Sequence, residues 1–259
     1  MAENPFRIKP IPSQPTENNH SPKFLVDLLL VSREVHLLGG PAGAGKTRWL
    51  LDNILLWADG QPFLEFPSHP VPWIYVAGDR STDSVCRTLA TMGIDPKRVP
   101  ILHAWDEKMG VNEILDKIIL SKAGLVVWES FGTLVNEPGR GPQVKAYMQR
   151  MSRFCQQTDK TIIGVMEAPK MKPFDRYENP RQRISGPVGW GHHAETIFLV
   201  EPVDIENPGN PYRILTVCLR NGAGIQKVLC FDPFGKLLIS NEVSVDQVVT
   251  KNLVRKSRK

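Results

Sequence analysis

Short continuous apolar runs alternate along much of the chain with segments whose apolar residues recur at helical spacing. The apolar runs have the length and the branched side chains typical of strands buried on both faces. We predict such strands at residues 34–38, 73–77, 99–103, 123–128 and 161–166. The intervening segments predict helices at residues 48–58, 81–93, 111–121 and 144–157, with a further short helix at 23–30. This alternation predicts an α/β fold with a mainly parallel, doubly wound sheet.

The pattern changes in the last quarter of the chain, where apolar runs follow one another without helical spacing between them. These runs predict strands at residues 196–200, 212–219, 226–231 and 236–239, with turns at 221–222 and 234–235. Consecutive strands joined by short turns pair antiparallel. We therefore expect antiparallel strands to extend the parallel sheet at its C-terminal side.

Composition suggests one domain with two tails. A length of 259 residues and 41% hydrophobic residues suit a single α/β domain with a sizeable core. We assign residues 1–22, with five prolines, to an extended N-terminal arm, residues 23–242 to the domain, and residues 243–259 to a basic tail. No apolar run is long enough for a membrane span, and the N-terminus has no hydrophobic signal core. These features predict a cytoplasmic protein that does not contact a membrane.

The residues between the first strand and the first helix fill the phosphate-binding pattern GxxxxGKT at every fixed position, as GPAGAGKT. A strand, a glycine loop and a helix in this order are the context that the motif requires. Glycines allow the loop to turn its backbone N–H groups inward, where they form an anion site at the helix N-terminus. The alternative is a glycine-rich turn that happens to precede a lysine.

Each position of this loop has an expected role toward ATP and Mg²⁺. Lys46 is expected to reach the β- and γ-phosphates, and the Thr47 hydroxyl to bind Mg²⁺. The expected nucleotide-binding residues are Gly40, Pro41, Ala42, Gly43, Ala44, Gly45, Lys46, Thr47 and Arg48. The sequence therefore predicts a Mg²⁺-dependent ATPase.

Two acids at strand ends are further candidates for the nucleotide site. Asp79 follows the strand after the loop helix, in YVAGDRSTD, and Glu129 ends the apolar run GLVVWES. With the phosphate loop, this arrangement resembles the RecA-core helicase group that includes the DnaB replicative helicase and the small RepA plasmid helicase. The resemblance implies a RecA-like fold, with Asp79 orienting the attacking water and Glu129 on the Mg²⁺ side. Asp79 alternatively is only the N-terminal acid of the next helix.

Further motifs carry the resemblance across residues 33 to 240. The segments RISG at 183–186 and HAET at 193–196 resemble a helicase pattern of a serine-glycine pair followed by an alanine-acid pair. The segment LRNGAG at 219–224 resembles a late hairpin whose arginine enters the neighbouring subunit's site, which implies that role for Arg220. The alternative for Arg220 is an ordinary turn arginine. The implied assembly is a homo-oligomer, a hexameric ring.

The chain departs from the family pattern at several of these positions. The family usually has Glu at the position of Asp79 and Asp at the position of Glu129. We interpret the two changes as compensating around one Mg²⁺ and one water, although a weakened ATPase is the rival explanation. Glu167 stands where the family commonly has His or Gln, and Cys218 replaces a basic residue near Arg220. We include Glu167 among the candidate catalytic residues because of its place at a strand end.

A long basic segment, residues 168–191, interleaves cations with aromatic side chains and shows no regular pattern. Cations follow phosphates while aromatic faces stack on bases, so this mixture suits single-stranded nucleic acid. In the resembling helicases a loop at this place faces the ring channel. The candidate DNA-binding residues are Arg140, Lys170, Lys172, Arg176, Arg181 and Arg183. The alternative is a solvated run of charge.

Together these observations predict a ring-forming ATPase that couples hydrolysis to movement on single-stranded DNA. Lys46, Asp79, Glu129, Glu167 and Arg220 are its candidate catalytic residues. The alternative is a recombinase-like or loader-type ATPase that binds DNA without separating strands. The sequence does not distinguish these uses.

Overall fold

The computed structural model describes most of the chain. The described residues are 23–132, 141–168, 180–184, 190–204, 207, 209–220, 224–233, 235–241 and 243–248. The predicted N-terminal arm, the turn at 221–222 and most of the basic tail lie outside the described residues. The beginning of that tail is described, and its valines Val243, Val245 and Val248 pack with Val228 of the sheet.

One large sheet organises the described part of the chain, in the strand order β11-β10-β9-β8-β3-β7-β6-β4-β5. The parallel strands are β3 (Val35–Gly39), β4 (Trp73–Val76), β5 (Ile101–Leu102), β6 (Leu125–Trp128), β7 (Thr161–Val165) and β8 (Thr196–Pro202). Strands β3, β6 and β7 are buried at every position, as a parallel sheet covered on both faces requires.

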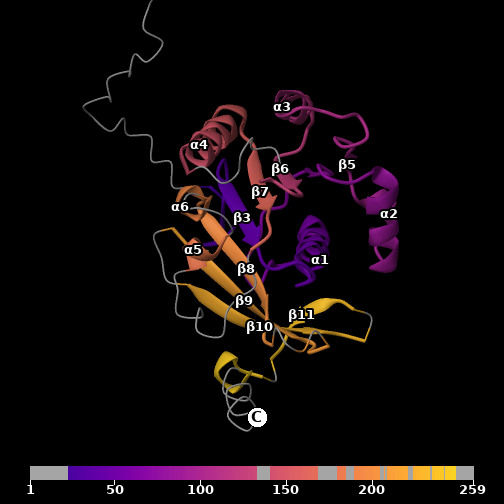
Figure 1. Ribbon diagram of the computed structural model, residues 1–259, viewed down its shortest axis with the longest axis vertical. Coiled ribbons are helices and arrows are strands. Elements are labelled where there is room, and N and C mark those ends of the chain that lie inside the picture. Colours follow the sequence, from indigo (N-terminus) through magenta and orange to yellow (C-terminus); the bar gives the residue numbers. More distant parts are fainter. Residues whose placement is uncertain are drawn as a thin grey trace, which may run out of the picture.

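Helices cover both faces of this sheet (Figure 1). The helices are α1 (Lys46–Ala58), α2 (Thr82–Thr91), α3 (Val111–Leu120) and α4 (Gly141–Thr158), with a 3₁₀ turn η1 (Pro96–Arg98). One hydrophobic cluster joins α1 and α2 to one face, and a second joins α3 and α4 to the other. Ser81 caps α2 as predicted, because its side chain accepts a hydrogen bond from the Ser84 N–H at 3.3 Å.

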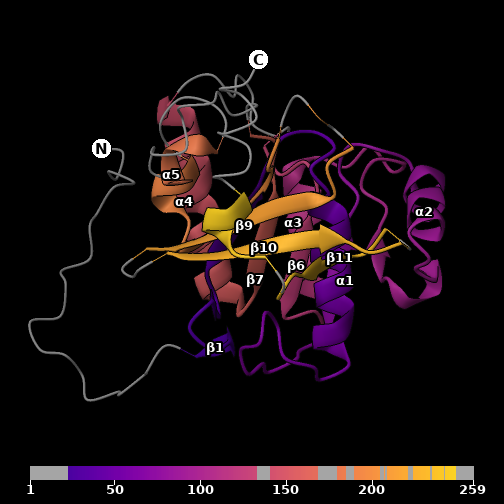
Figure 2. The ribbon, with the colours of Figure 1, turned by 90° about the horizontal axis from the view of Figure 1, so that it is seen from below.

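Three antiparallel strands extend the sheet beyond β8. They are β9 (Tyr212–Leu219), β10 (Ile225–Phe231) and β11 (Leu237–Ile239). Figure 2 shows them side by side, with β11 close to α1. The parallel sheet with its antiparallel extension confirms the predicted fold class.

The chain folds differently from the prediction at residues 23–30. These residues belong to a small antiparallel pair, β1 (Phe24–Val26) and β2 (Leu30–Val31), and not to a helix. Leu25, Val26, Leu29 and Leu30 are all buried, and their spacing is also the spacing of a helix face. Leu28 has a φ of 63° in the turn between the strands, a conformation that breaks a helix.

The basic segment is not a loop throughout. Two single-turn helices, α5 (Pro180–Arg183) and α6 (Trp190–His193), lie in it. Ile184 and Trp190 are buried against α4 and the sheet, and this packing explains why the segment forms regular structure there. The remaining positions of the segment, 169–179 and 185–189, lie outside the described residues.

Candidate functional site

The four parallel strands β3, β4, β6 and β7 end at the same edge of the sheet. The phosphate loop follows β3, Asp79 follows β4, Glu129 follows β6 and Glu167 follows β7. In open α/β sheets ligands bind outside the carboxyl ends of the strands. The fold thus gathers at one edge the four features that the sequence separates by about 130 residues.

The phosphate loop has the backbone that its glycines were expected to allow. Gly40, Gly43 and Gly45 have φ values of 152°, 76° and 93°. A side chain at Gly40 would place its Cβ 2.2 Å from the carbonyl oxygen of Val200 on β8. At Gly45 a Cβ would lie 3.0 Å from the ring of Phe231 on β10. The loop is therefore shaped by close contact with the sheet as well as by its conformation.

Lys46 turns back over this loop. Its Nζ donates hydrogen bonds to the carbonyl oxygens of Gly40 and Pro41, at 2.9 and 3.0 Å. Burial lowers the pKa of the Lys46 ammonium, while the charges of Glu167 and Glu129 act in the opposite direction. The ammonium is thus held above the anion site by carbonyl groups that a phosphate can replace.

Thr47 and Glu129 come together across the site. The Thr47 hydroxyl donates a hydrogen bond to Oε1 of Glu129 at 2.9 Å. Burial raises the pKa of the Glu129 carboxyl, and the Thr47 hydrogen bond and the Lys46 charge oppose that shift. A hydroxyl and a carboxylate oxygen at this separation are the hard ligands that Mg²⁺ prefers, so these two residues fit a Mg²⁺ ion.

Glu129 has two further partners that the sequence did not indicate. Arg80 donates to both carboxylate oxygens, with Nη2 2.7 Å from Oε2 and 2.9 Å from Oε1 and with Nε 3.2 Å from Oε2. The buried Tyr75 hydroxyl also donates to Oε2. Glu129 is therefore a nearly buried carboxylate that is held by Tyr75 of the neighbouring strand β4 and by Arg80 of the turn after it.

The other two acids face solvent. Asp79 is exposed at the end of β4 and accepts a hydrogen bond from the hydroxyl of Ser130. Ser130 follows Glu129 and has a φ of 54°, which turns the chain after β6. Glu167 is exposed two residues beyond β7, and its charge acts on Lys46. Both acids are therefore accessible to solvent at the end of the sheet that carries the phosphate loop.

Two buried arginines lie next to the phosphate loop. Arg48 is buried and pairs through Nε with Asp52 on the next turn of α1, at 2.7 Å, so its side chain serves the helix. Its predicted place among the nucleotide-binding residues stays a prediction. Arg213 of β9 is also buried; its Nε lies 3.3 Å from the carbonyl oxygen of Ala44, and its guanidinium lies 4.9 Å from the centre of the Phe231 ring.

Arg220 lies beside the amino end of β8, whereas its own phosphate loop lies at the carboxyl ends of the parallel strands. Its backbone N–H bonds to Glu195, which precedes β8, and its guanidinium lies 3.6 Å from the Glu195 carboxylate. The phosphate loop contacts β8 at Val200, five residues further on, which corresponds to about 17 Å of strand. The Arg220 side chain is half exposed. It does not reach the site of its own subunit.

Two of the candidate DNA-binding residues make contacts within the protein. Arg181 donates to the carbonyl oxygens of Gly191 and Ala194 at 2.7 and 2.8 Å. Arg183 is buried and pairs with the buried Glu201 at 2.8 Å. The sequence interpretation of Arg181 and Arg183 is corrected, because their guanidinium groups bind the protein itself. Arg140, Lys170, Lys172 and Arg176 lie outside the described residues.

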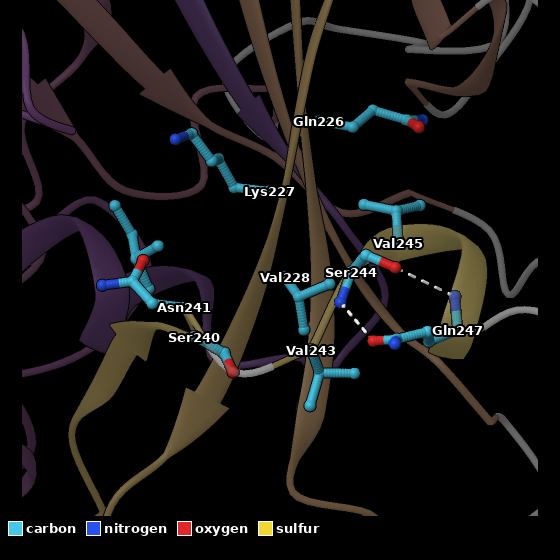
Figure 3. A pocket seen from close by; sticks show the side chains of 10 residues that line it. Gln226, Lys227, Val228, Ser240, Asn241, Val243, Ser244, Val245 and Gln247 are labelled. Atoms are coloured by element: carbon cyan, nitrogen blue, oxygen red, sulfur yellow. Dashed lines mark hydrogen bonds between the residues drawn. The ribbon is translucent and has the colours of Figure 1, made fainter.

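A cavity of about 500 Å³ lies elsewhere in the molecule (Figure 3). It is lined by β10, the end of β11 and the segment that follows, where Ser244 and Gln247 bond to each other's backbone N–H groups. None of its lining residues is a candidate phosphate, metal or catalytic residue. The nucleotide site is therefore defined by its chemistry and its place at the sheet edge, and not by the size of a pocket.

Sequence reasoning missed four residues of the site: Tyr75, Arg80, Ser130 and Arg213. Arg80 and Ser130 directly follow the two recognised acids, and that adjacency was the available signal. Tyr75 resembles an ordinary strand residue, and Arg213 lies far along the chain in an antiparallel strand. Their contacts follow from the strand order. β4 lies beside β6, and β9 lies beside β8, which in turn lies beside β3.

A phosphate loop after the first strand of a doubly wound sheet, with a Thr47–Glu129 pair beside it, defines a RecA-like P-loop ATPase. Comparison with known families agrees. The chain belongs to the AAA domain family, whose model matches residues 3–172. No curated protein matches the chain.

A solved structure supports the fold. A KaiC-like protein from the hyperthermophilic archaeon Pyrococcus horikoshii OT3 superposes with a TM-score of 0.58 at 15% sequence identity. The match covers 83% of this chain and 93% of the other. Among the helices that the structure describes, none has the length and hydrophobicity that crossing a membrane requires.

Proposed function

We propose that the protein is a Mg²⁺-dependent ATPase that assembles into a ring, a hexamer, and couples ATP hydrolysis to movement on single-stranded DNA. The observation that carries the ATPase part is the 2.9 Å contact between the Thr47 hydroxyl and Glu129 beside a phosphate loop of the required backbone. The second candidate is a recombinase-like or loader-type ATPase on the same DNA, with no strand separation. We place the motor in residues 23–242, between the arm and the basic tail, in the cytoplasm.

The proposed roles follow the geometry of the site. Lys46 and the loop N–H groups bind the β- and γ-phosphates of ATP, replacing the carbonyl contacts of the Lys46 ammonium. Thr47 and Glu129 hold Mg²⁺, which neutralises charge on the phosphate oxygens. Asp79, fixed by Ser130, orients the attacking water, and Glu167 sets the charge near the γ-phosphate.

The position of Arg220 supports an oligomer. An arginine that stabilises charge in the transition state contributes about 10³ to 10⁵ in rate. Arg220 is half exposed and lies at the far edge of its own sheet, so in this proposal it acts on the site of the next subunit. In a closed ring every subunit receives one such arginine, because heterologous contacts form a ring when the rotation between subunits closes.

The DNA part rests on the cations that follow the sheet edge. Arg140 follows β6 in the chain, and Lys170, Lys172 and Arg176 follow β7. The last described residue before the second group, Ala168, donates its N–H to the Gly40 carbonyl of the phosphate loop at 2.9 Å. In the proposal this link connects the state of the nucleotide to the segment that binds DNA.

The DNA assignment is tested by salt-dependent binding of a single-stranded oligonucleotide, measured by fluorescence anisotropy. Replacing Lys170, Lys172 and Arg176 with Ala should lower the slope of log affinity against log salt by about 0.7 for each phosphate that the variant no longer neutralises. The matched control replaces the exposed Lys97 and Lys108, between α2 and α3 in the chain, and the exposed Lys117 of α3, which should leave the slope unchanged. Equal slopes in both variants would place the DNA elsewhere.

A helicase assay separates the two candidate functions. With ATP and Mg²⁺, the motor should displace a labelled strand from a forked duplex, and closed rings should be visible by negative-stain microscopy. DNA-stimulated hydrolysis without displacement, with filaments in place of rings, would favour the recombinase-like candidate.

A further inference from the structure

Arg80 is a positively charged residue inside the site, and none of the roles proposed above involves it. It follows Asp79 in the turn between β4 and α2, and its Nη1 donates to the Thr88 hydroxyl of α2 at 3.1 Å. The Thr88 hydroxyl in turn donates to the Ser84 carbonyl at 2.9 Å. The guanidinium therefore spans from α2 to the Glu129 carboxylate, with 27% of its side chain exposed.

The Glu129 carboxylate is saturated by the contacts it makes. It receives hydrogen bonds from the Thr47 hydroxyl and the Tyr75 hydroxyl. Arg80 adds three more contacts, one from Nε and two from Nη2. An ionised carboxylate offers about four lone-pair positions on its two oxygens. No position on Glu129 is left for another ligand while all these contacts persist.

A divalent ion bound by Thr47 and Glu129 needs one of those positions. Mg²⁺ binds oxygen at about 2.0–2.1 Å with near-octahedral geometry, which tolerates no crowding. The Tyr75 hydroxyl is fully buried under the sheet edge, and Thr47 is itself a proposed ligand of the ion. Arg80 is the partner that is both partly exposed and positively charged, so it is the one that a cation displaces.

We propose that Arg80 and the divalent metal ion compete for Glu129, so that binding of a metal nucleotide requires the guanidinium to leave this carboxylate. This inference rests on the proposed function, in which Glu129 is the acid on the metal side. Arg80 is then a positioning residue: it holds Glu129 directed at the phosphate loop until the metal arrives. Its effect appears only in the metal-dependent part of nucleotide affinity.

A purely structural ion pair is the rival explanation. Removing one partner of a buried pair leaves an uncompensated charge and destabilises the fold. Both explanations therefore predict a lower melting temperature for Arg80→Gln, and stability does not distinguish them. The two explanations differ in the ratio of ADP affinity in Mg²⁺ to ADP affinity in EDTA.

The test is isothermal titration of the full chain with ADP, in Mg²⁺ and in excess EDTA. Arg80→Gln should raise the ratio of the two affinities about tenfold, a typical coupling between two sites, because the competitor of the metal is gone. Thr88→Val keeps the charge but removes the anchor on α2, and it should raise the ratio in the same direction by less. Arg87→Gln, an exposed arginine of α2, is the control and should leave the ratio unchanged.

Each other outcome contradicts the proposal in a different way. An unchanged ratio in Arg80→Gln with a lower melting temperature would make Arg80 a structural partner only. A lower ratio would mean that Arg80 helps to hold the metal nucleotide. If Arg80→Gln does not fold, an unchanged ratio in Thr88→Val overturns the proposal. If the wild-type chain binds ADP equally with and without Mg²⁺, the metal site itself is wrong and the proposed function fails first.

Discussion

At the scale of single residues, the two exchanged acids have different surroundings. The longer acid, Glu129, is nearly buried and reaches Thr47, whereas the shorter acid, Asp79, is exposed and held by Ser130. An acid that orients water needs access to solvent, and an acid that holds a metal needs fixed geometry. The surroundings therefore fit the roles proposed for each acid despite the change of length.

Asp79→Asn should bind ATP with wild-type affinity and hydrolyse it about 10² to 10⁴ times more slowly, because the amide cannot accept the proton of the water. Single-turnover hydrolysis and nucleotide titration measure the two quantities separately. Asp83→Asn, at an exposed acid in the first turn of α2, is the control and should retain normal turnover. Normal hydrolysis by Asp79→Asn would make Asp79 only an acid before that helix.

A second residue prediction concerns His36, which is buried in the middle of β3. Its Nε2 lies 2.9 Å from the Val31 carbonyl, and burial lowers its pKa to about 4. The unfolded chain binds this proton near the usual pKa of about 6.5, so the group destabilises the fold as pH falls from 6.5 toward 4. Below pH 4 both states are protonated and the destabilisation stops growing.

Urea unfolding of the wild-type chain and of His36→Gln at pH 7 and pH 5 measures this contribution. The free energy of unfolding of the wild-type chain should fall by about 2 kcal/mol more than that of the variant between the two pH values. The difference between the two proteins removes the effect of the other histidines. Equal decreases in both proteins would mean that folding does not lower the pKa of His36.

At the scale of elements, the phosphate loop is held between the sheet and its own helix. β8 contacts it at Gly40, and β10 contacts it at Gly45. Gly43, in contrast, has no heavy atom within 4 Å of the place where a Cβ would stand. The three glycines therefore all have a positive φ but differ in the space around them, and this difference can be measured.

Gly40→Ala should destabilise the fold by about 3 kcal/mol, because strain and a backbone clash add. Gly43→Ala should destabilise it by only about 1 kcal/mol, which is the effect of a positive φ alone. Urea unfolding of the two variants without nucleotide provides the comparison. Equal destabilisation would show that the loop is not packed against β8 as described.

Most elements could be predicted because their apolar patterns are unambiguous, as for β6 and α3. Residues 23–30 could not, since apolar residues in pairs four apart fit a helix face and a small sheet pair equally well. The acids of the site could be placed because each ends a strand. Arg80 could not, because its contact with Glu129 depends on β4 lying beside β6, and spacing along the chain does not give the strand order.

At the scale of the whole molecule, the sheet has its phosphate loop at one edge and Arg220 at the other. A single subunit therefore lacks the arginine that the proposed mechanism needs. In the proposed function this asymmetry gives each subunit a donor surface and an acceptor surface, which is the geometry of a heterologous contact. The central claim is that the site is completed between subunits.

Mixing two inactive variants tests this claim most directly. Lys46→Ala subunits keep Arg220 but do not hydrolyse ATP, and Arg220→Ala subunits keep an intact phosphate loop but cannot assist a neighbour. ATPase activity should be at background for each variant alone and should appear in the mixture, where an intact loop meets an intact Arg220. A mixture as inactive as its components, with co-assembly shown by native mass spectrometry, would contradict a site shared between subunits.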